Sequence, residues 1–380
     1  MFKNFMSPSK ELFGISEYLY LVFLFAVVAM STLGYTSSNF LYKIVVVLGG
    51  LFAAVKLLLQ RYSAKYLVIS LFLLGLGFIE IVTSKRVTIF LTVLLLIAAK
   101  GISEKRIMST FLTAKISGLI LMICFVALGI FKVQKHLYYK MSSESYIQRI
   151  VINGSGTTVL HLSVITCFIL FFYLKRGKVN FTFYILYFLC NCFAFRVSYS
   201  TMGFLVGFIS LLLFGALEYS RYIRRRFISF AWFYIPLFIL STLIVSLMYS
   251  RVAFVNQLDR FFQGRIYYNH YFLTNYPFSI FGVGMLSDEG NFDNSYVYVW
   301  VVYGALTFSL LFGALQVVIK DRMSRLDWVA IAVIFVYLLA GISESFYPSA
   351  AVNPSLFFLL CLFDSVKGKK NAKHIQRRAK

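Results

Sequence analysis

The chain has 380 residues, of which 60% are apolar and only 13% are charged, roughly half the charged share of soluble domains. The apolar residues fall into repeated blocks close to the ~20 residues that a helix needs to cross a bilayer core. This composition excludes a soluble globular enzyme and predicts an all-α, polytopic integral membrane protein. The net charge of +23 does not indicate nucleic-acid binding, because the basic residues form short clusters between apolar blocks, where they set membrane topology.

Twelve apolar blocks are expected to form transmembrane helices within a single membrane domain that covers residues 1–380. In chain order the blocks are 18–33, 40–59, 66–82, 87–99, 111–131, 157–174, 179–195, 201–217, 227–248, 294–319, 327–343 and 354–366. The fourth block is short and begins beside Lys85 and Arg86. Lys43, Lys56 and Glu80 lie near block ends, where snorkelling to the membrane interface is expected.

The distribution of basic residues predicts the orientation of these helices. With twelve spans, the termini and the loops on their side carry 24 positive charges, and the opposite loops carry ten. The positive-inside rule then places both termini in the cytoplasm, together with the basic tail 367–380.

Two outer loops are long, at residues 132–156 and 250–293, and long ordered loops on a membrane scaffold often carry function. The second loop mixes Arg260 and Arg265 with tyrosines and His270. Guanidinium groups bind phosphate oxygens in pairs, and aromatic faces pack against sugars. Such a loop suits a phosphorylated, sugar-bearing ligand, although the same charges could simply solvate an exposed loop.

Three further charged residues are candidates at the outer ends of the helices. Asp293 could accept a proton from an attacking sugar hydroxyl, although Asp293 or Asn294 could equally cap the helix that follows. Arg196 could bind the ligand or anchor the seventh block at the interface, and Glu344 could act in catalysis or remain a solvated loop charge. The chain has no Walker A loop, Asp-x-Asp pair, His/Cys ligand cluster or G-x-S-x-G elbow, so neither nucleotide nor metal cofactor is expected.

One spaced pattern in the late loop resembles that of a known family. The pattern reads R-x4-R, then P-x-x-x-F-G-V-G, then D-N-S-Y-x6-Y-G, and comprises Arg260, Arg265, Pro277, Phe281 to Gly284, Asp293 to Tyr296, Tyr303 and Gly304. It resembles the Wzy-type polysaccharide polymerases, which are related to the O-antigen ligases. Those proteins share the architecture expected here, with many helices, a large late outer loop and a Glu before the final helix.

The resemblance implies an enzyme of the bacterial cytoplasmic membrane. Such an enzyme transfers a glycan from an undecaprenyl-diphosphate donor to another lipid-linked repeat unit on the outer leaflet, building capsule, exopolysaccharide or O-antigen without a cofactor. Membrane lipid, a chain-length regulator and a flippase are the implied partners. The matching positions imply that Arg260 and Arg265 hold the diphosphate, assisted by Arg196, and that Asn294 and Tyr296 contribute to the substrate site.

The sequence leaves the general base open among three residues. Related ligases carry a His-Asn pair where this chain has Asp293 and Asn294, so the base could be Asp293, His270 or Glu344. Two other functions also stay open. A lipid-linked oligosaccharide flippase would have a similar number of helices, with polar residues near the bilayer midplane. A membrane acyltransferase would need a catalytic histidine such as His161.

Overall fold

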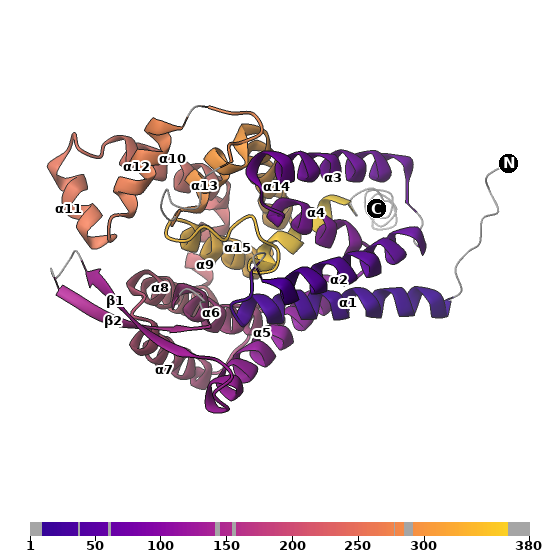
Figure 1. Ribbon diagram of the computed structural model, residues 1–380, viewed down its shortest axis with the longest axis horizontal. Coiled ribbons are helices and arrows are strands. Elements are labelled where there is room, and N and C mark those ends of the chain that lie inside the picture. The colour runs from indigo at the N-terminus through magenta and orange to yellow at the C-terminus, as the bar shows by residue number, and fades with distance from the viewer. Residues whose placement is uncertain are drawn as a thin grey trace.

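The computed structural model describes residues 10–36, 39–59, 62–140, 145–153, 157–276, 278–284 and 292–363, and the described secondary structure is helical apart from one hairpin (Figure 1). Pro277 and the tail 367–380 lie outside these residues. The elements in chain order are α1 (Lys10–Thr32), α2 (Phe40–Leu59), α3 (Ala64–Ser84), α4 (Thr88–Ala98), α5 (Glu104–Ala127), β1 (Val133–Lys140), β2 (Ser145–Ile152), α6 (Thr157–Leu174), α7 (Phe181–Ser198), α8 (Thr201–Tyr219), α9 (Arg221–Phe230), η1 (Ala231–Phe233), α10 (Tyr234–Leu247), α11 (Ala253–Phe261), α12 (Arg265–Asn275), α13 (Ser295–Val302), α14 (Gly304–Ser324), α15 (Trp328–Gly341) and η2 (Pro354–Leu359).

Eight helical stretches in the described part of the chain are long and apolar enough to cross a membrane. They are α1, α2, α3, α5, α7, α8, α14 and the continuous stretch from α9 through α10. The other four expected spans coincide with shorter apolar helices, at Thr88–Ala98, Thr158–Leu174, Trp328–Gly341 and Pro354–Phe363. The chain is therefore a polytopic helical membrane protein, with eight helices of spanning length among its described residues.

The apolar helix α15 is buried inside the bundle. Eleven of its residues are buried, and the four consecutive side chains Ile331 to Ile334 are fully inaccessible. A helix that is apolar on every side lies either in lipid or in a protein core, and α15 packs against α6, α8, α10 and α14. These contacts place α15 in the core of the protein.

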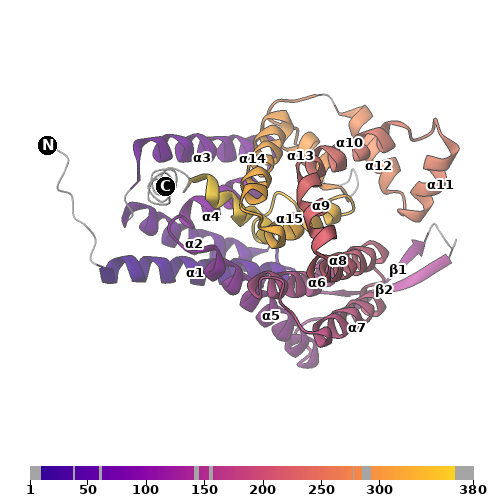
Figure 2. The same ribbon diagram turned by 180° about the vertical axis from the view of Figure 1, so that it is seen from behind.

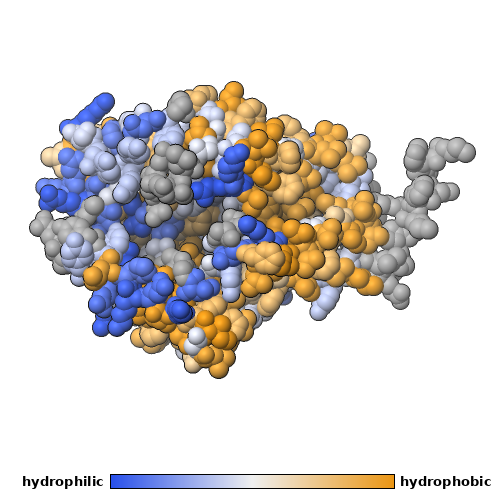
Figure 3. Space-filling model, in the orientation of Figure 1, coloured by the Kyte–Doolittle hydropathy of each residue, from blue (hydrophilic) through white to orange (hydrophobic). Residues whose placement is uncertain are grey.

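The two long loops contain secondary structure that the sequence analysis did not predict. Residues 132–156 include the antiparallel hairpin β1–β2, in which His136 faces Arg149, and residues 250–293 include α11 and α12. Both views place the hairpin and α11–α12 at the same end of the molecule (Figures 1 and 2). Hydrophilic residues gather at that end, whereas hydrophobic residues cover α1 to α4 (Figure 3). The long loops thus form a polar region at one end of an apolar bundle.

The expected snorkelling of Lys56 and Glu80 is wrong, because both side chains are fully buried. The Lys56 ammonium donates hydrogen bonds to the carbonyls of Ala98 and Lys100, the latter at 3.0 Å, and so satisfies the C-terminal end of α4. The Thr307 hydroxyl donates to Glu80 Oε1 at 2.7 Å. Packing against α4 and α14 draws these charges inward, which their position near a helix end does not reveal.

Two glycines of the family-like pattern meet at the junction between α13 and α14. Gly282 and Gly304 have φ angles of +77° and +78°, and a Cβ on Gly304 would lie 2.3 Å from the Gly282 nitrogen. The backbones are joined by hydrogen bonds from Ala305 N to Ser279 O at 2.9 Å and from Leu306 N to Ile280 O at 3.1 Å. The F-G-V-G and Y-G segments therefore form one structural joint that fixes where α13 ends.

Replacing Gly304 with alanine is expected to lower the free energy of unfolding by at least about 2 kcal/mol, because it adds backbone strain and a backbone clash. Gly313→Ala is the matched control, since Gly313 lies inside α14 with nothing within 4 Å of its added Cβ; it should be neutral or stabilising by up to about 1 kcal/mol. Denaturant unfolding of the purified proteins checks this. Equal stability of the two variants would contradict the proposed joint.

Candidate functional site

A cluster of two carboxylates around one guanidinium forms at the polar end of the bundle. Arg265, the first residue of α12, places Nε 3.3 Å from Asp293 Oδ2 and Nη2 3.6 Å from Glu344 Oε1. The exposed side-chain fractions are 13% for Arg265, 42% for Asp293 and 19% for Glu344. A charge so withdrawn from water requires opposite charges beside it, and two other segments supply them here, at Asp293 and Glu344.

Hydrogen bonds between the start of α13 and the chain after α15 hold the two carboxylates in place. Asn294 is fully buried; its Oδ1 caps α13 by accepting from Tyr296 N at 2.9 Å, and its Nδ2 donates to Ile342 O at 2.8 Å. Ser295 donates to the Glu344 carbonyl and accepts from Tyr347 N. These hydrogen bonds join the start of α13 to the chain that follows α15. They therefore fix the positions of Asp293 and Glu344.

The hairpin contributes a second guanidinium to this cluster. Arg149 on β2 stacks on the Tyr138 ring of β1, with Cζ 3.6 Å from the ring centroid, and its Nη2 donates to Tyr199 O at 3.4 Å. Burial lowers the pKa of Arg149, as does the charge of Arg265, whereas Tyr138, Asp293 and Glu344 raise it. The sequence singles out Arg149 as a charge of interest in the first long loop, but does not place it beside Tyr138 or these acids.

Burial shifts the proton affinity of both acids upward. Burial raises the pKa of Glu344 to about 7, against the opposing effect of Arg265 and with a smaller raising effect of Asp293. Burial also raises the pKa of Asp293, while Arg265 and Arg149 oppose the rise. With both acids ionised the four side chains are neutral overall, and protonation of Glu344 gives them a net charge of +1.

The cluster retains hydrogen-bonding capacity. Among the described residues, Arg149 Nε is buried and has no hydrogen-bond partner, whereas Arg265 Nε and Glu344 Oε1 make only the ion-pair contacts given above. Beside Arg265 lies a cavity of about 190 Å³, lined by residues of α10, α11 and α12 together with Asn294 and Ile342. Because Arg265 lines this cavity, its guanidinium is placed to bind the oxygens of an anionic ligand there.

The structure does not bring every expected site residue into the cluster. His270 Nδ1 pairs with Ser246 O at 3.0 Å, toward α10. Arg196 is exposed at the end of α7 and contacts Tyr199. Arg260 is exposed on α11. Tyr296 is 1% exposed and donates to Leu338 O at 2.7 Å, so its geometry serves packing between α13 and α15. Their roles toward a substrate remain predictions.

His161, the residue considered for an acyltransferase, lies in a satisfied buried network. Its Nε2 is 2.8 Å from Asn191 Oδ1 and its Nδ1 is 3.2 Å from Ser198 Oγ. In the part of the chain that the structure describes, no group of three or more His, Cys, Asp or Glu side chains is placed to share a metal ion. Comparisons with protein-family models, with curated proteins and with solved structures find no match to this chain.

Glu344→Gln is expected to flatten the dependence of stability on pH. A pKa raised in the folded state to about 7, from 4.5, gives wild type a stabilisation that is present below pH 4.5 and lost as the pH rises to about 7. The variant should lack this loss, which amounts to up to about 3 kcal/mol. Thermal unfolding in detergent between pH 4.5 and 7.5 measures it. Asp321→Asn, at the far end of α14, should follow wild type; parallel curves for wild type and Glu344→Gln would contradict the assignment.

Proposed function

We propose that this protein is a Wzy-type polymerase that joins undecaprenyl-diphosphate-linked repeat units on the outer leaflet of the bacterial cytoplasmic membrane. The observation that carries the proposal is the cluster of Arg265, Asp293 and Glu344. These residues belong to the segments that resemble the family, and they meet at the polar end of the bundle. The orientation with both termini in the cytoplasm belongs to the same proposal.

In the proposed step, an acceptor sugar hydroxyl attacks the anomeric carbon of the donor glycan. The hydroxyl proton passes to the Asp293 carboxylate as the new carbon–oxygen bond forms. The bond from the anomeric carbon to the diphosphate oxygen breaks, and undecaprenyl diphosphate leaves with its charge stabilised by Arg265 and Arg149. Direct displacement inverts the anomeric centre and draws its energy from the donor, without a nucleotide.

The arrangement of the two acids supports Asp293 as the base. Asp293 is the more exposed of the two, so an acceptor hydroxyl can reach it, and its raised pKa strengthens it as a proton acceptor. Glu344 is deeper and pairs with Arg265 from the other side. A donor diphosphate that binds the Arg265 guanidinium would replace Asp293 in its ion pair. Glu344 would then hold Arg265 in position.

A flippase remains the alternative, and one observation favours it. Lys56, Glu80 and Lys115 are buried within helices of spanning length, and ionisable residues at such positions often mark transport paths. Each of them, however, has a protein partner: Lys56 the end of α4, Glu80 the Thr307 hydroxyl, and Lys115 the Ser163 hydroxyl at 3.2 Å. Structural hydrogen bonding accounts for all three, which favours the surface reaction.

Chain growth in proteoliposomes with lipid-diphosphate-linked repeat units tests the proposal. Arg265→Ala is expected to slow growth at least about a hundredfold, because the leaving diphosphate loses its main cation, and Asp293→Asn about a hundredfold or more, because proton transfer is lost. Arg251→Ala is the matched control: Arg251 is an exposed arginine of the same loop, and its loss should change the rate by no more than about twofold.

The same assay separates the remaining possibilities, provided that each variant elutes and unfolds like wild type. Loss of growth in His270→Ala but not in Asp293→Asn would move the base to His270. Equal rates for Arg265→Ala and Arg251→Ala would remove the site from the late loop. Movement of lipid-linked sugar between leaflets, without chain growth by wild type, would reject the polymerase in favour of the flippase.

A further inference from the structure

A second, larger cavity lies at the other end of the two helices that lead to the candidate site. It has a volume of about 820 Å³ and is bordered by the starts of α5 and α15, the ends of α6 and α14, and the turn between α6 and α7. From Gly304 to Ser324, α14 extends about 30 Å, so this cavity is well separated from Arg265. It belongs to a different face of the protein.

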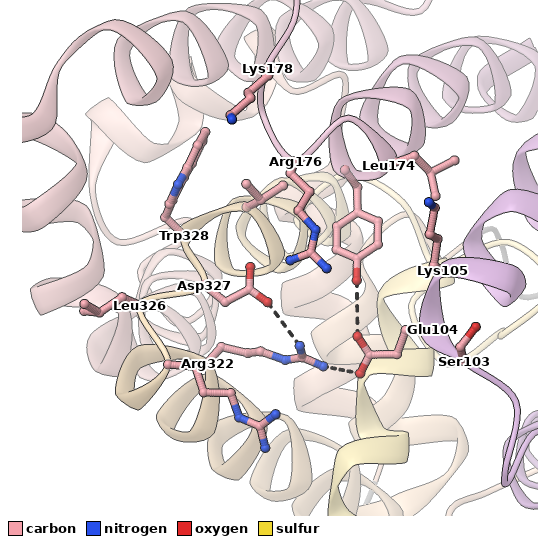
Figure 4. Close-up of a pocket in the computed structure, with 13 residues that line it drawn as sticks. Ser103, Glu104, Lys105, Leu174, Arg176, Lys178, Arg322, Leu326, Asp327 and Trp328 are labelled. Carbon is pink, nitrogen blue, oxygen red and sulfur yellow. Dashed lines mark hydrogen bonds and ion pairs between the residues drawn. The ribbon is translucent and has the colours of Figure 1, made fainter. Parts of the chain in front are cut away.

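A buried ion network forms one wall of this cavity (Figure 4). Arg322, with a side chain only 7% exposed, donates to Asp327 Oδ2 at 3.1 Å and to Glu104, which also accepts from the Tyr173 hydroxyl at 3.2 Å. One arginine thus pairs with both acids of the cavity lining, and the three charged side chains together carry a net charge of −1. The Nε atom of Arg322 is buried and has no hydrogen-bond partner among the described residues.

Three further cations line the cavity without a counter-charge. Arg176 extends toward the Arg322 network, with Lys178 and Lys105 on either side of it (Figure 4). Within the described residues, none of the three forms an ion pair, whereas Arg325 is paired with Asp321 at 3.0 Å. All three side chains are exposed to solvent, and together they give this side of the cavity a positive potential that attracts anions. The lining therefore favours an anion with several acceptor oxygens.

Part of the cavity lining is apolar and closely packed. Trp328 packs edge-on against Phe172 at 5.8 Å between centroids, and Arg224 stacks on it at 4.5 Å. Gly177 lies so close that a Cβ there would be 2.2 Å from the indole. Leu174, Leu326 and Val329 are further apolar residues of the lining. A ligand of this cavity would combine an anionic group with an apolar part.

We propose that this cavity binds a phosphate ester through Arg176, Lys178 and Lys105, with the apolar part of the ligand against Trp328. Phosphate offers enough oxygens for three cations, and guanidinium and ammonium groups are its usual partners. An anionic phospholipid headgroup and a soluble phosphate ester share this chemistry. The site does not depend on the proposed polymerase reaction, because it lies at the other end of α14 and α15.

Binding to the purified full-length protein tests this site with two probes. One probe is phosphatidylglycerol in phosphatidylcholine nanodiscs, scored by lipid retained in native mass spectrometry; the other is glycerol 3-phosphate with protein in neutral detergent. Arg176→Gln/Lys178→Gln should weaken binding of at least one probe by about tenfold or more. The matched control, Lys175→Gln/Arg225→Gln, removes two exposed charges outside the cavity lining and should change binding by less than about twofold.

Selective loss with phosphatidylglycerol assigns the site to a lipid headgroup, and selective loss with glycerol 3-phosphate assigns it to a soluble ester. Equal weakening in both double variants, or binding of neither probe by wild type, overturns the proposal. Arg176→Lys changes the same position but keeps the positive charge, so it should retain most of the binding. Retained binding in this variant, beside loss in the Gln variant, shows that the loss comes from the missing charge and not from misfolding. Polymerase activity is not part of the readout, so failure of one proposal leaves the other standing.

Discussion

A guanidinium withdrawn from water needs anions beside it, and at Arg265 this requirement ties together three distant parts of the chain. Asp293 and Glu344 supply the anions, and each adjoins the bonds by which Asn294 and Ser295 join α13 to the end of α15. Because α15 is the buried centre of the bundle, the position of the cluster is set by the core of the protein. A site on long loops is in this way fixed to a rigid scaffold.

The glycine joint supports the same arrangement from the other side of α13. Close backbone contact between Gly282 and Gly304 ends α13 after eight residues and starts α14 in a new direction. The spaced pattern that resembles the polymerases therefore has two physical parts: the arginine and the acid form the charged cluster, and the glycines build the turn that holds it. This division explains why one pattern mixes residues suited to chemistry with residues suited only to close packing.

The sequence predicts a bundle of apolar helices, because runs of apolar residues near spanning length have few other stable structures in lipid. The expected block 294–319 is divided into α13 and α14, and four of the twelve blocks form helices shorter than spanning length. It does not reveal that Lys56 caps α4, since that contact exists only once α2 and α4 pack together. The hairpin carrying Arg149 lies outside the apolar blocks, and its strands mix polar, basic and aromatic residues, so the apolar pattern does not reveal it. Arg265 and Asp293 lie in one predicted loop, so the sequence indicates a shared site for these two residues. The position of Glu344 beside Arg265 depends on how α13 packs against α15, which the sequence does not reveal.

The most direct test of this account is a structure of the protein bound to a non-reactive analogue of a lipid diphosphate. The account predicts diphosphate oxygens within hydrogen-bond distance of Arg265 and Arg149, with the Asp293 carboxylate released toward the sugar. A diphosphate bound elsewhere, with Arg265 still paired to both Asp293 and Glu344, would contradict it.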